Sequence, residues 1–275
     1  MIRTGGYMTN FKTVYIYAPH AEERKRVKPE LETLFNRLNI EIIEDKNTAD
    51  IIASVGGDGA FLKAVRDVNF RDDCVYLGIA TANKTHFYAD FHLNNLQQLE
   101  EAFLRDNFDP RKYPTIEVRV NDNQPLYCLN EFTIRSSIIK TIRMDLYIND
   151  FLFEQFMGDG IVVSTPTGST GYNKSLGGAI VDPLIHAIQI TELASVNSNT
   201  HRTLGTSFLL EKERPLTILV DKQLDYYPLL ALDNEALGVI NTDKIVIRVS
   251  DKFIHTLRME NNTFWHKTKR NFLQK

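Results

Sequence analysis

The hydrophobic periodicity of this chain changes near residue 110, and that change limits the folds available to it. Up to Arg111, short β-rich runs alternate with segments whose apolar residues recur every three or four positions, as in an amphipathic helix. Strands are predicted at 12–17, 40–43, 51–55 and 75–79, and helices at 21–38, 60–68 and 93–103. Strands that alternate with helices form a parallel sheet with right-handed crossovers. The first part is therefore predicted to be an α/β domain.

After the prolines at 110 and 114, the pattern becomes that of antiparallel strands. Asn149-Asp150 separates two strand-like runs, and these residues tolerate the positive φ of a tight hairpin turn. Strands are predicted at 115–120, 143–148, 151–156, 216–220, 229–232 and 244–249. One helix is expected at 183–195, with Ile185, Ile188, Leu193 and Ala194 facing inward.

These patterns predict two domains, a Rossmann-like α/β domain at 1–110 and a mostly antiparallel β domain at 111–254. The tail, about 255–275, is expected to pack back on the first domain and to include a short helix near 264–273. Lys267, Lys269 and Arg270 could reach a phosphate, but they are interpreted as a solvated part of this tail.

Composition places the chain among soluble globular proteins. Hydrophobic residues make up 43% of it, enough to fill a core, and charged residues make up 24%. The longest apolar runs fall far short of the ~18 residues that span a bilayer, and 1–6 does not resemble a signal peptide. A net charge of −3 argues against a nucleic-acid partner. Two cysteines, Cys74 and Cys128, cannot form a disulfide framework, which favours the cytoplasm.

A glycine-rich turn follows the predicted strand 51–55. Gly56, Gly57 and Gly59 allow backbone N–H groups to approach a phosphate, and the helix behind them adds a partial positive charge. Asp58 lies among these glycines, where phosphate repels a carboxylate unless it holds a metal or accepts a proton from an attacking hydroxyl. A tight turn in which Asp58 only caps the helix explains the tetrad equally well. The position at a strand end favours the functional interpretation.

The segment 158–178, GDGIVVSTPTGSTGYNKSLGG, is the richest in Gly, Ser and Thr. It offers many hydrogen-bonding groups and, in Tyr172, a ring for stacking, which suits a nucleotide better than a plain surface loop. Asn130 presents a donor and an acceptor that suit the edge of an adenine, and Glu131 can accept hydrogen bonds from ribose hydroxyls. Taken alone, this dipeptide is better explained as polar residues at a strand end.

Together and in this order, 56–59, Asn130-Glu131-Phe132 and 158–178 resemble the NAD kinase family, as does Phe87-Tyr88-Ala89-Asp90. The resemblance extends over most of the chain, and 158–178 is its most specific part. It implies transfer of the γ-phosphate of ATP, or sometimes polyphosphate, to the 2′-hydroxyl of the adenosine ribose of NAD, with Mg²⁺, giving NADP. It also implies a homo-oligomer, a dimer or tetramer, in which the β domains associate.

The resemblance also implies roles for individual positions. Asp58 matches the catalytic aspartate, the general base on that hydroxyl, and no residue is assigned as a metal ligand. Gly56, Gly57 and Gly59 match the phosphate-facing turn. The positions that match the dinucleotide site are Phe87, Tyr88, Asn130, Glu131, Asp159, Thr167, Thr170, Gly171, Tyr172, Ser175, Ala194 and Val196, with Arg202 and Asp233 in aligned functional segments.

The chain departs from the family pattern at three places. Ala60 replaces a threonine whose hydroxyl could contact a phosphate or metal-bound water. The stretch 79–86 is one residue longer than the family's glycine-rich segment and lacks its glycines, and Asn234 stands where Gly or His is common. Two alternatives therefore stay open: a non-catalytic NAD- or NADP-binding regulatory paralogue, and a lipid or sugar kinase of the wider group with this glycine tetrad. The segment 158–178 argues against the second.

Overall fold

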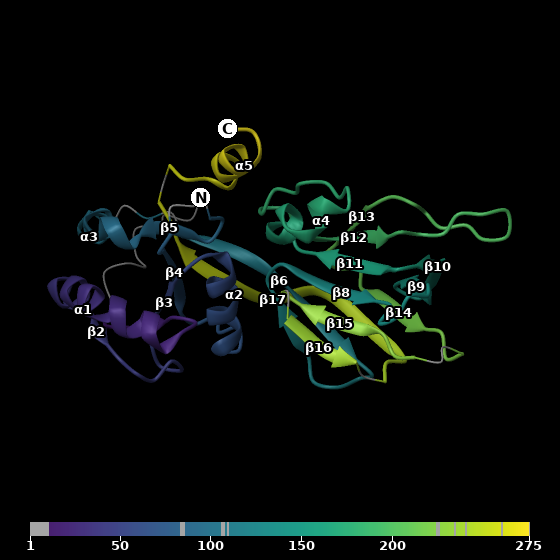
Figure 1. The fold of residues 1–275 in the computed structure, drawn as a ribbon, viewed down its shortest axis with the longest axis horizontal. Helices are drawn as coiled ribbons and strands as arrows, with labels where there is room; N and C mark the ends of the chain where they lie inside the picture. The colour runs from purple at the N-terminus through teal and green to yellow at the C-terminus, as the bar shows by residue number, and fades with distance from the viewer. Residues whose placement is uncertain are drawn as a thin grey trace. The chain divides into compact units, whose positions relative to one another are not determined.

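The computed structural model describes residues 11–82, 86–105, 108, 110–223, 226–233, 235–239, 241–259 and 261–274. Part of the altered stretch 79–86 and Asn234 lie outside these residues. The chain forms two compact units, Met1–Lys112 with Ile254–Lys275, and Tyr113–Phe253. Two long strands, β6 (Arg111–Val120) and β17 (Lys244–Leu257), have residues in both units (Figure 1).

The first unit contains a parallel sheet, as the alternating pattern predicts. Its strand order is β17-β4-β3-β1-β2, and the short β5 extends the edge of β4 beyond the end of β17. Besides β17, the strands of this sheet are β1 (Thr13–Tyr17), β2 (Glu41–Ile42), β3 (Ile51–Val55), β4 (Val75–Ala80) and β5 (Ala89–His92). Every residue of β3 is buried, so both faces of the sheet are covered at its centre.

The helices of the first unit pack on this sheet through the apolar residues that their periodicity predicts. In α1, Val27, Leu31, Leu34 and Phe35 are buried in the same core as the strands. The helical elements are α1 (Ala21–Arg37), α2 (Asp58–Asp67), η1 (Leu93–Asn95), α3 (Leu96–Leu104) and α5 (Phe264–Phe272). The expected helix in the tail is thus present as α5.

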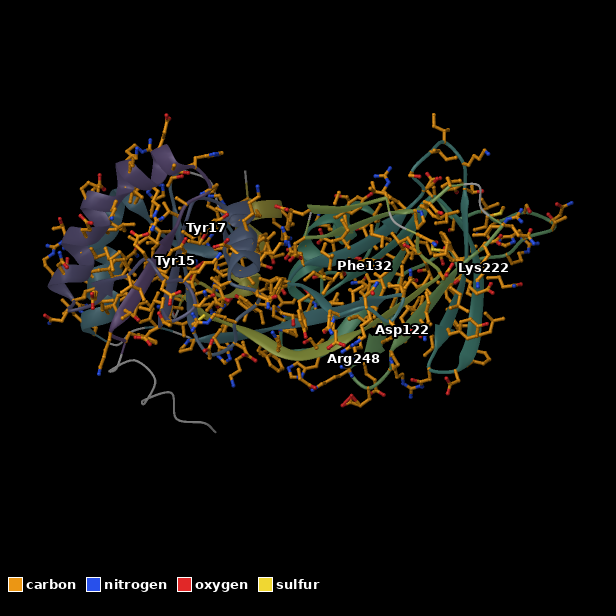
Figure 2. The ribbon with its side chains drawn as sticks, turned by 90° about the horizontal axis from the view of Figure 1, so that it is seen from below. Tyr15, Tyr17, Asp122, Phe132, Lys222 and Arg248 are labelled. Carbon is orange, nitrogen blue, oxygen red and sulfur yellow. The ribbon has the colours of Figure 1, made fainter. Side chains whose placement is uncertain are left out.

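The second unit contains two antiparallel sheets around one core, which confirms the predicted change of architecture. One sheet has the order β10-β9-β14-β17, in which β6 also pairs with β17 and β7 pairs with β6. The second sheet has the order β13-β12-β11-β8-β15-β16. Phe132, fully buried on β8, lies in the core that both sheets share (Figure 2). The strands are β7 (Leu126–Cys128), β8 (Glu131–Arg135), β9 (Ile142–Ile148), β10 (Phe151–Gly158), β11 (Gly160–Ser164), β12 (Ala187–Leu193), β13 (Phe208–Glu211), β14 (Leu216–Val220), β15 (Leu229–Leu232) and β16 (Glu235–Val239).

The prediction of a helix at 183–195 is wrong, because most of this segment forms strand β12. Its backbone pairs with β11 on one side and β13 on the other, and Ile188 and Leu193 are buried. Ile185, expected to face inward, is 49% exposed before the strand begins, and Ala194 is exposed just after it ends. A short apolar run has no decisive period, and the tertiary pairing on both edges selects the strand.

Both cysteines are buried free thiols. In the described part of the chain, no helix combines the length and the apolar character that crossing a membrane would require.

Candidate active site

The glycine-rich turn of the first unit connects β3 to α2. Gly56 has φ 135°, and a Cβ added there would lie 2.7 Å from the Cβ of Ala60, so both backbone and packing require glycine. Gly57 is the N-cap of α2, and no side chain caps this end of the helix. The first N–H groups of α2 therefore lack a capping side chain at the positive end of the helix dipole.

Asp58 is the first residue of α2, and its carboxylate is held by a segment outside the helix. Its Oδ2 accepts a hydrogen bond from the backbone N–H of Phe87 at 3.0 Å, and its Oδ1 accepts one from that of Tyr88 at 2.8 Å. The structure therefore does not support the interpretation that Asp58 only caps the helix. Each oxygen keeps further acceptor capacity for a ligand.

Tyr88 contributes to this arrangement through its backbone, because its ring belongs to the core. The residue is 7% exposed, and its ring stacks on Phe61 of α2, with centroids 4.8 Å apart and planes within 6°. The ring of Phe87 contacts the rings of Phe264 and Phe272 on α5, at 5.8 Å and 6.1 Å. Both predicted dinucleotide contacts thus lie beside Asp58, with rings that make contacts inside the first unit.

Two residues beside this turn have surroundings that the sequence analysis does not predict. The ring of His86 lies 2.9 Å from the position of a Cβ on Gly57, and its Nε2 is buried without a hydrogen-bond partner among the described residues. Lys267, interpreted as part of a solvated tail, is instead 2% exposed and forms an ion pair with Asp90. Lys269 and Arg270 are exposed, as predicted. The sequence gives no sign of the Lys267 pairing, because its partner lies in a distant segment.

In the second unit, Asp233 holds the turn that presents Asn130 and Glu131. Its carboxylate, on a residue only 4% exposed, accepts hydrogen bonds from the backbone N–H groups of Leu129, Asn130 and Glu131. The backbone N–H of Asp233 in turn donates to the carbonyl oxygen of Glu131 at 3.0 Å. Asp233, predicted as a site residue, therefore acts here by orienting its neighbours.

The hydroxyl-rich loop packs directly on this turn. Thr165 Oγ1 donates to the carbonyl oxygen of Leu129 at 2.6 Å and accepts from the N–H of Gly168 at 2.9 Å. A Cβ on Gly168 would lie 2.1 Å from the carbonyl oxygen of Asn130, so only glycine permits this approach. The loop thus brings three predicted residues, Thr167, Thr170 and Gly171 on or beside η2 (Thr167–Thr170), next to Asn130 and Glu131.

The far side of the loop is fixed by Asn173, which sequence analysis also missed. This residue is fully buried; its Nδ2 donates to the carbonyl oxygens of Ser169 and Ala179, and its Oδ1 accepts from Thr191. It lies in the short helix α4 (Tyr172–Ser175), whose predicted site residues Tyr172 and Ser175 are exposed. The buried amide anchors the loop and leaves the neighbouring side chains outward for a ligand.

A second group of predicted residues lies where β10 meets β11 and β12 ends. The N–H of Asp159 donates to the carbonyl oxygen of Leu193 at 2.9 Å, and the N–H of Val196 donates to that of Met157 at 2.8 Å. These bonds place Asp159, Ala194 and Val196 together. Arg202 is exposed on the following loop, and among the described residues no hydrogen bond or ion pair joins it to the others.

Glu131 has an unusual electrostatic environment for a carboxyl group. It is 8% exposed, and its Oε2 has no hydrogen-bond partner in the described part of the chain. Burial, with a smaller contribution from the charge of Asp233, raises the pKa of Glu131 to about 8. The group is therefore largely protonated at neutral pH, so it can donate a hydrogen bond to a sugar oxygen as well as accept one.

Glu131→Gln is expected to remove a pH dependence of stability. Because the folded-state pKa is raised, the native state holds a proton that the unfolded chain releases above about pH 4.5. Stability should fall as pH rises from there to about 8, by at most about 1.4 kcal/mol per pH unit. The glutamine variant should lack this slope in denaturant titrations at several pH values. Equal slopes in both proteins would show that Glu131 is ionised in the folded state.

The fold and the two sites define a class of protein, a nucleotide-dependent phosphotransferase. One unit has a rigidly held carboxylate beside a glycine-rich turn at the uncapped start of a helix, which suits phosphate chemistry. The other unit has a glycine- and hydroxyl-rich loop that presents polar groups and a tyrosine, which suits a nucleotide.

Comparison with known proteins identifies the family. A family model described as the ATP-NAD kinase C-terminal domain matches residues 129–259. The chain is 48% identical to NAD kinase 2 of Bacillus licheniformis, over 97% of this chain and 100% of that protein. It is 47% identical to NAD kinase 2 of Bacillus subtilis, over 95% of this chain and 98% of that protein. The chain belongs to the NAD kinase family, and the family predicted from the motifs is confirmed.

Solved structures show the same fold at low sequence identity. Yeast NADH kinase complexed with NADH superposes with a TM-score of 0.81 at 18% identity, covering 97% of this chain and 90% of that one. An NAD kinase from Archaeoglobus fulgidus in complex with ATP gives a TM-score of 0.74 at 21% identity, covering 94% and 98%. The chain is therefore an NAD kinase, as its family shows.

Proposed function

We propose that Asp58 is the general base of this NAD kinase. It takes the proton from the ribose 2′-hydroxyl while that oxygen forms a bond to the γ-phosphorus of ATP, the bond to the bridging oxygen breaks, and ADP leaves. The observation that carries this assignment is the pair of backbone N–H groups that fixes both carboxylate oxygens. A base held in one orientation needs little rearrangement to meet the hydroxyl.

The phosphates of ATP are proposed to approach the turn formed by Gly56, Gly57 and Gly59. In support, a Cβ placed on Gly59 meets no atom within 4 Å apart from its chain neighbours and the backbone of its own helix, so the chain leaves this space open. The uncapped N-terminus of α2 adds N–H groups and a partial positive charge. Ala60 is buried against Gly56, so the missing threonine hydroxyl leaves this contact apolar.

Magnesium is proposed to enter with the nucleotide. Among the described residues, no group of three or more His, Cys, Asp or Glu side chains could hold a metal ion. Mg²⁺ does not need such a group, because it is usually held by one or two carboxylates, water and substrate phosphates. Held through the phosphates, the ion would neutralise part of their charge.

The dinucleotide is proposed to bind the hydroxyl-rich loop and the turn held by Asp233. Asn130 would meet the adenine edge, Glu131 the ribose, and Tyr172 would offer its exposed ring for stacking. The other proposed contacts are Phe87, Tyr88, Asp159, Thr167, Thr170, Gly171, Ser175, Ala194, Val196 and Arg202.

We also propose that the protein is cytoplasmic and forms a homo-oligomer, a dimer or tetramer, through association of the β-rich units. Light scattering would test the oligomeric state.

Gly59→Ala tests the phosphate site without disturbing the fold. Gly59 lies within α2 with open space around it, so alanine should leave stability unchanged or raise it by up to about 1 kcal/mol. NADP formation should nevertheless fall at least about tenfold, because the methyl group would stand between backbone and phosphate. Rates would be measured with ATP and with polyphosphate in parallel. Unchanged kinetics with both donors would place the transferred phosphate elsewhere.

A further inference from the structure

A fully buried ion pair connects the C-terminal helix to the segment that holds Asp58. Lys267 on α5 and Asp90 on β5 have side chains only 3% and 1% exposed, and they form a direct salt bridge. The Nζ of Lys267 also donates to the backbone carbonyl oxygen of Phe87 at 2.6 Å. Buried charges persist only when they are paired and hydrogen-bonded, so this geometry is tightly determined.

Asp90 gathers two more donors from the chain that leads into α5. Its Oδ2 accepts from the N–H of Met259 at 2.9 Å, and its Oδ1 accepts from the side-chain amide of Asn262 at 2.9 Å. Three points of the C-terminal segment therefore converge on one carboxylate. The helix is fixed to β5 and to the residues just before it.

Phe87 links this network to Asp58. Its N–H donates to the Asp58 carboxylate, while the carbonyl oxygen of the same residue accepts from Lys267. Its ring contacts Phe264 and Phe272 at the two ends of α5, so polar and aromatic contacts both tie it to the helix. Phe87 therefore connects α5 to one oxygen of Asp58, and its neighbour Tyr88 binds the other oxygen.

We propose that α5 is part of the apparatus that orients Asp58, with Lys267 as its positioning residue. Lys267 itself does not contact the carboxylate of Asp58; it fixes the peptide whose N–H does. This inference rests on the proposed role of Asp58 as the base. It assigns to the C-terminal helix a function in the reaction, beyond covering the sheet.

The test is a neutral replacement of the buried pair, Lys267→Met combined with Asp90→Asn. Removing both charges avoids leaving one of them buried alone, and asparagine can still accept a hydrogen bond. We expect kcat to fall roughly tenfold to a hundredfold, because small misplacements of reacting groups have effects of this size. The KM for ATP should change less than about threefold, since uniform binding is retained. Lys269→Met, an exposed lysine on the same helix, is the matched control and should match the wild type.

Two further readouts separate positioning from a general structural role. Hydrogen exchange at the amides of Phe87 and Tyr88 should accelerate in the double variant, while amides of β3 keep their protection. In an Asp58→Asn background, the double replacement should cost less than about a further twofold in kcat, because both changes act through one group. A full additional loss would overturn the proposal, as would a folded double variant with wild-type kcat.

Phe272→Ala tests the same link if the double variant does not fold, and amide exchange tests it if Asp58 is not the base. Phe272→Ala removes one ring contact to Phe87 at a 39% exposed position, and it should lower kcat severalfold with the same change in amide exchange. Wild-type kcat and exchange in a folded Phe272→Ala protein would then contradict it. An active Asp58→Asn enzyme would refute the base, whereas exchange at Phe87 and Tyr88 still reports whether α5 holds the segment.

Discussion

Asp58→Asn is expected to reduce kcat for NADP formation by roughly 10²–10⁴-fold, the usual contribution of a general base. Asparagine has nearly the same shape as aspartate, but it cannot accept the proton of the ribose 2′-hydroxyl. The proposed dinucleotide contacts of Asn130, Glu131 and Tyr172 do not involve this carboxylate, so NAD should still bind. Steady-state kinetics with both phosphate donors and calorimetric titration with NAD would measure the two effects.

The variant also carries a structural cost that the measurement must separate. The N–H groups of Phe87 and Tyr88 each bind a different oxygen of Asp58, and in asparagine one of these oxygens becomes an NH₂ group that faces a donor. One unsatisfied donor of this kind costs about 1–3 kcal/mol. Asp67→Asn, at the far end of α2 where Asp67 pairs with Lys46, is the matched control and should keep full activity. A folded Asp58→Asn enzyme within about tenfold of the wild-type rate would contradict the assignment of the base.

The sequence predicts the elements whose hydrophobic period is long or whose ends are marked by turn residues. Strands β3, β14 and β15 lie at the predicted bounds, because glycines or polar turns flank short β-rich runs. In α1, the buried stripe consists of the apolar residues that recur every three or four positions. The strand β12 was predicted as a helix because its register depends on two neighbouring strands that local pattern does not reveal.

The candidate site was predictable as a set of motifs, and its supporting contacts were not. Glycines around Asp58 indicate phosphate chemistry, since backbone freedom and close approach are local properties. The partners that hold Asp58, by contrast, are backbone N–H groups, which every residue except proline carries, so no residue type marks them. Lys267 and Asp90 are likewise ordinary charged residues until the fold buries them together.

Asp233→Ala is expected to have the largest effect on stability, because one carboxylate satisfies several backbone groups. The N–H groups of Leu129, Asn130 and Glu131 would all lose their acceptor. At about 1–3 kcal/mol for each unsatisfied donor, partly offset by rearrangement, the unfolding free energy should fall by about 3–6 kcal/mol. Asp233 also has φ 47°, a conformation that aspartate tolerates better than alanine. Urea unfolding would measure the loss.

NAD binding should be lost with the turn, because Asp233 orients Asn130 and Glu131 and the loop of Thr165 packs on the same backbone. Asp233→Asn keeps an acceptor and the tolerance of positive φ, so it should retain more stability and more affinity than alanine. Asp251→Ala, which removes an exposed carboxylate paired with Lys212, is the control and should change stability by less than about 1 kcal/mol. If Asp233→Ala unfolds at the wild-type urea concentration and binds NAD with wild-type affinity, the carboxylate does not hold this turn in solution.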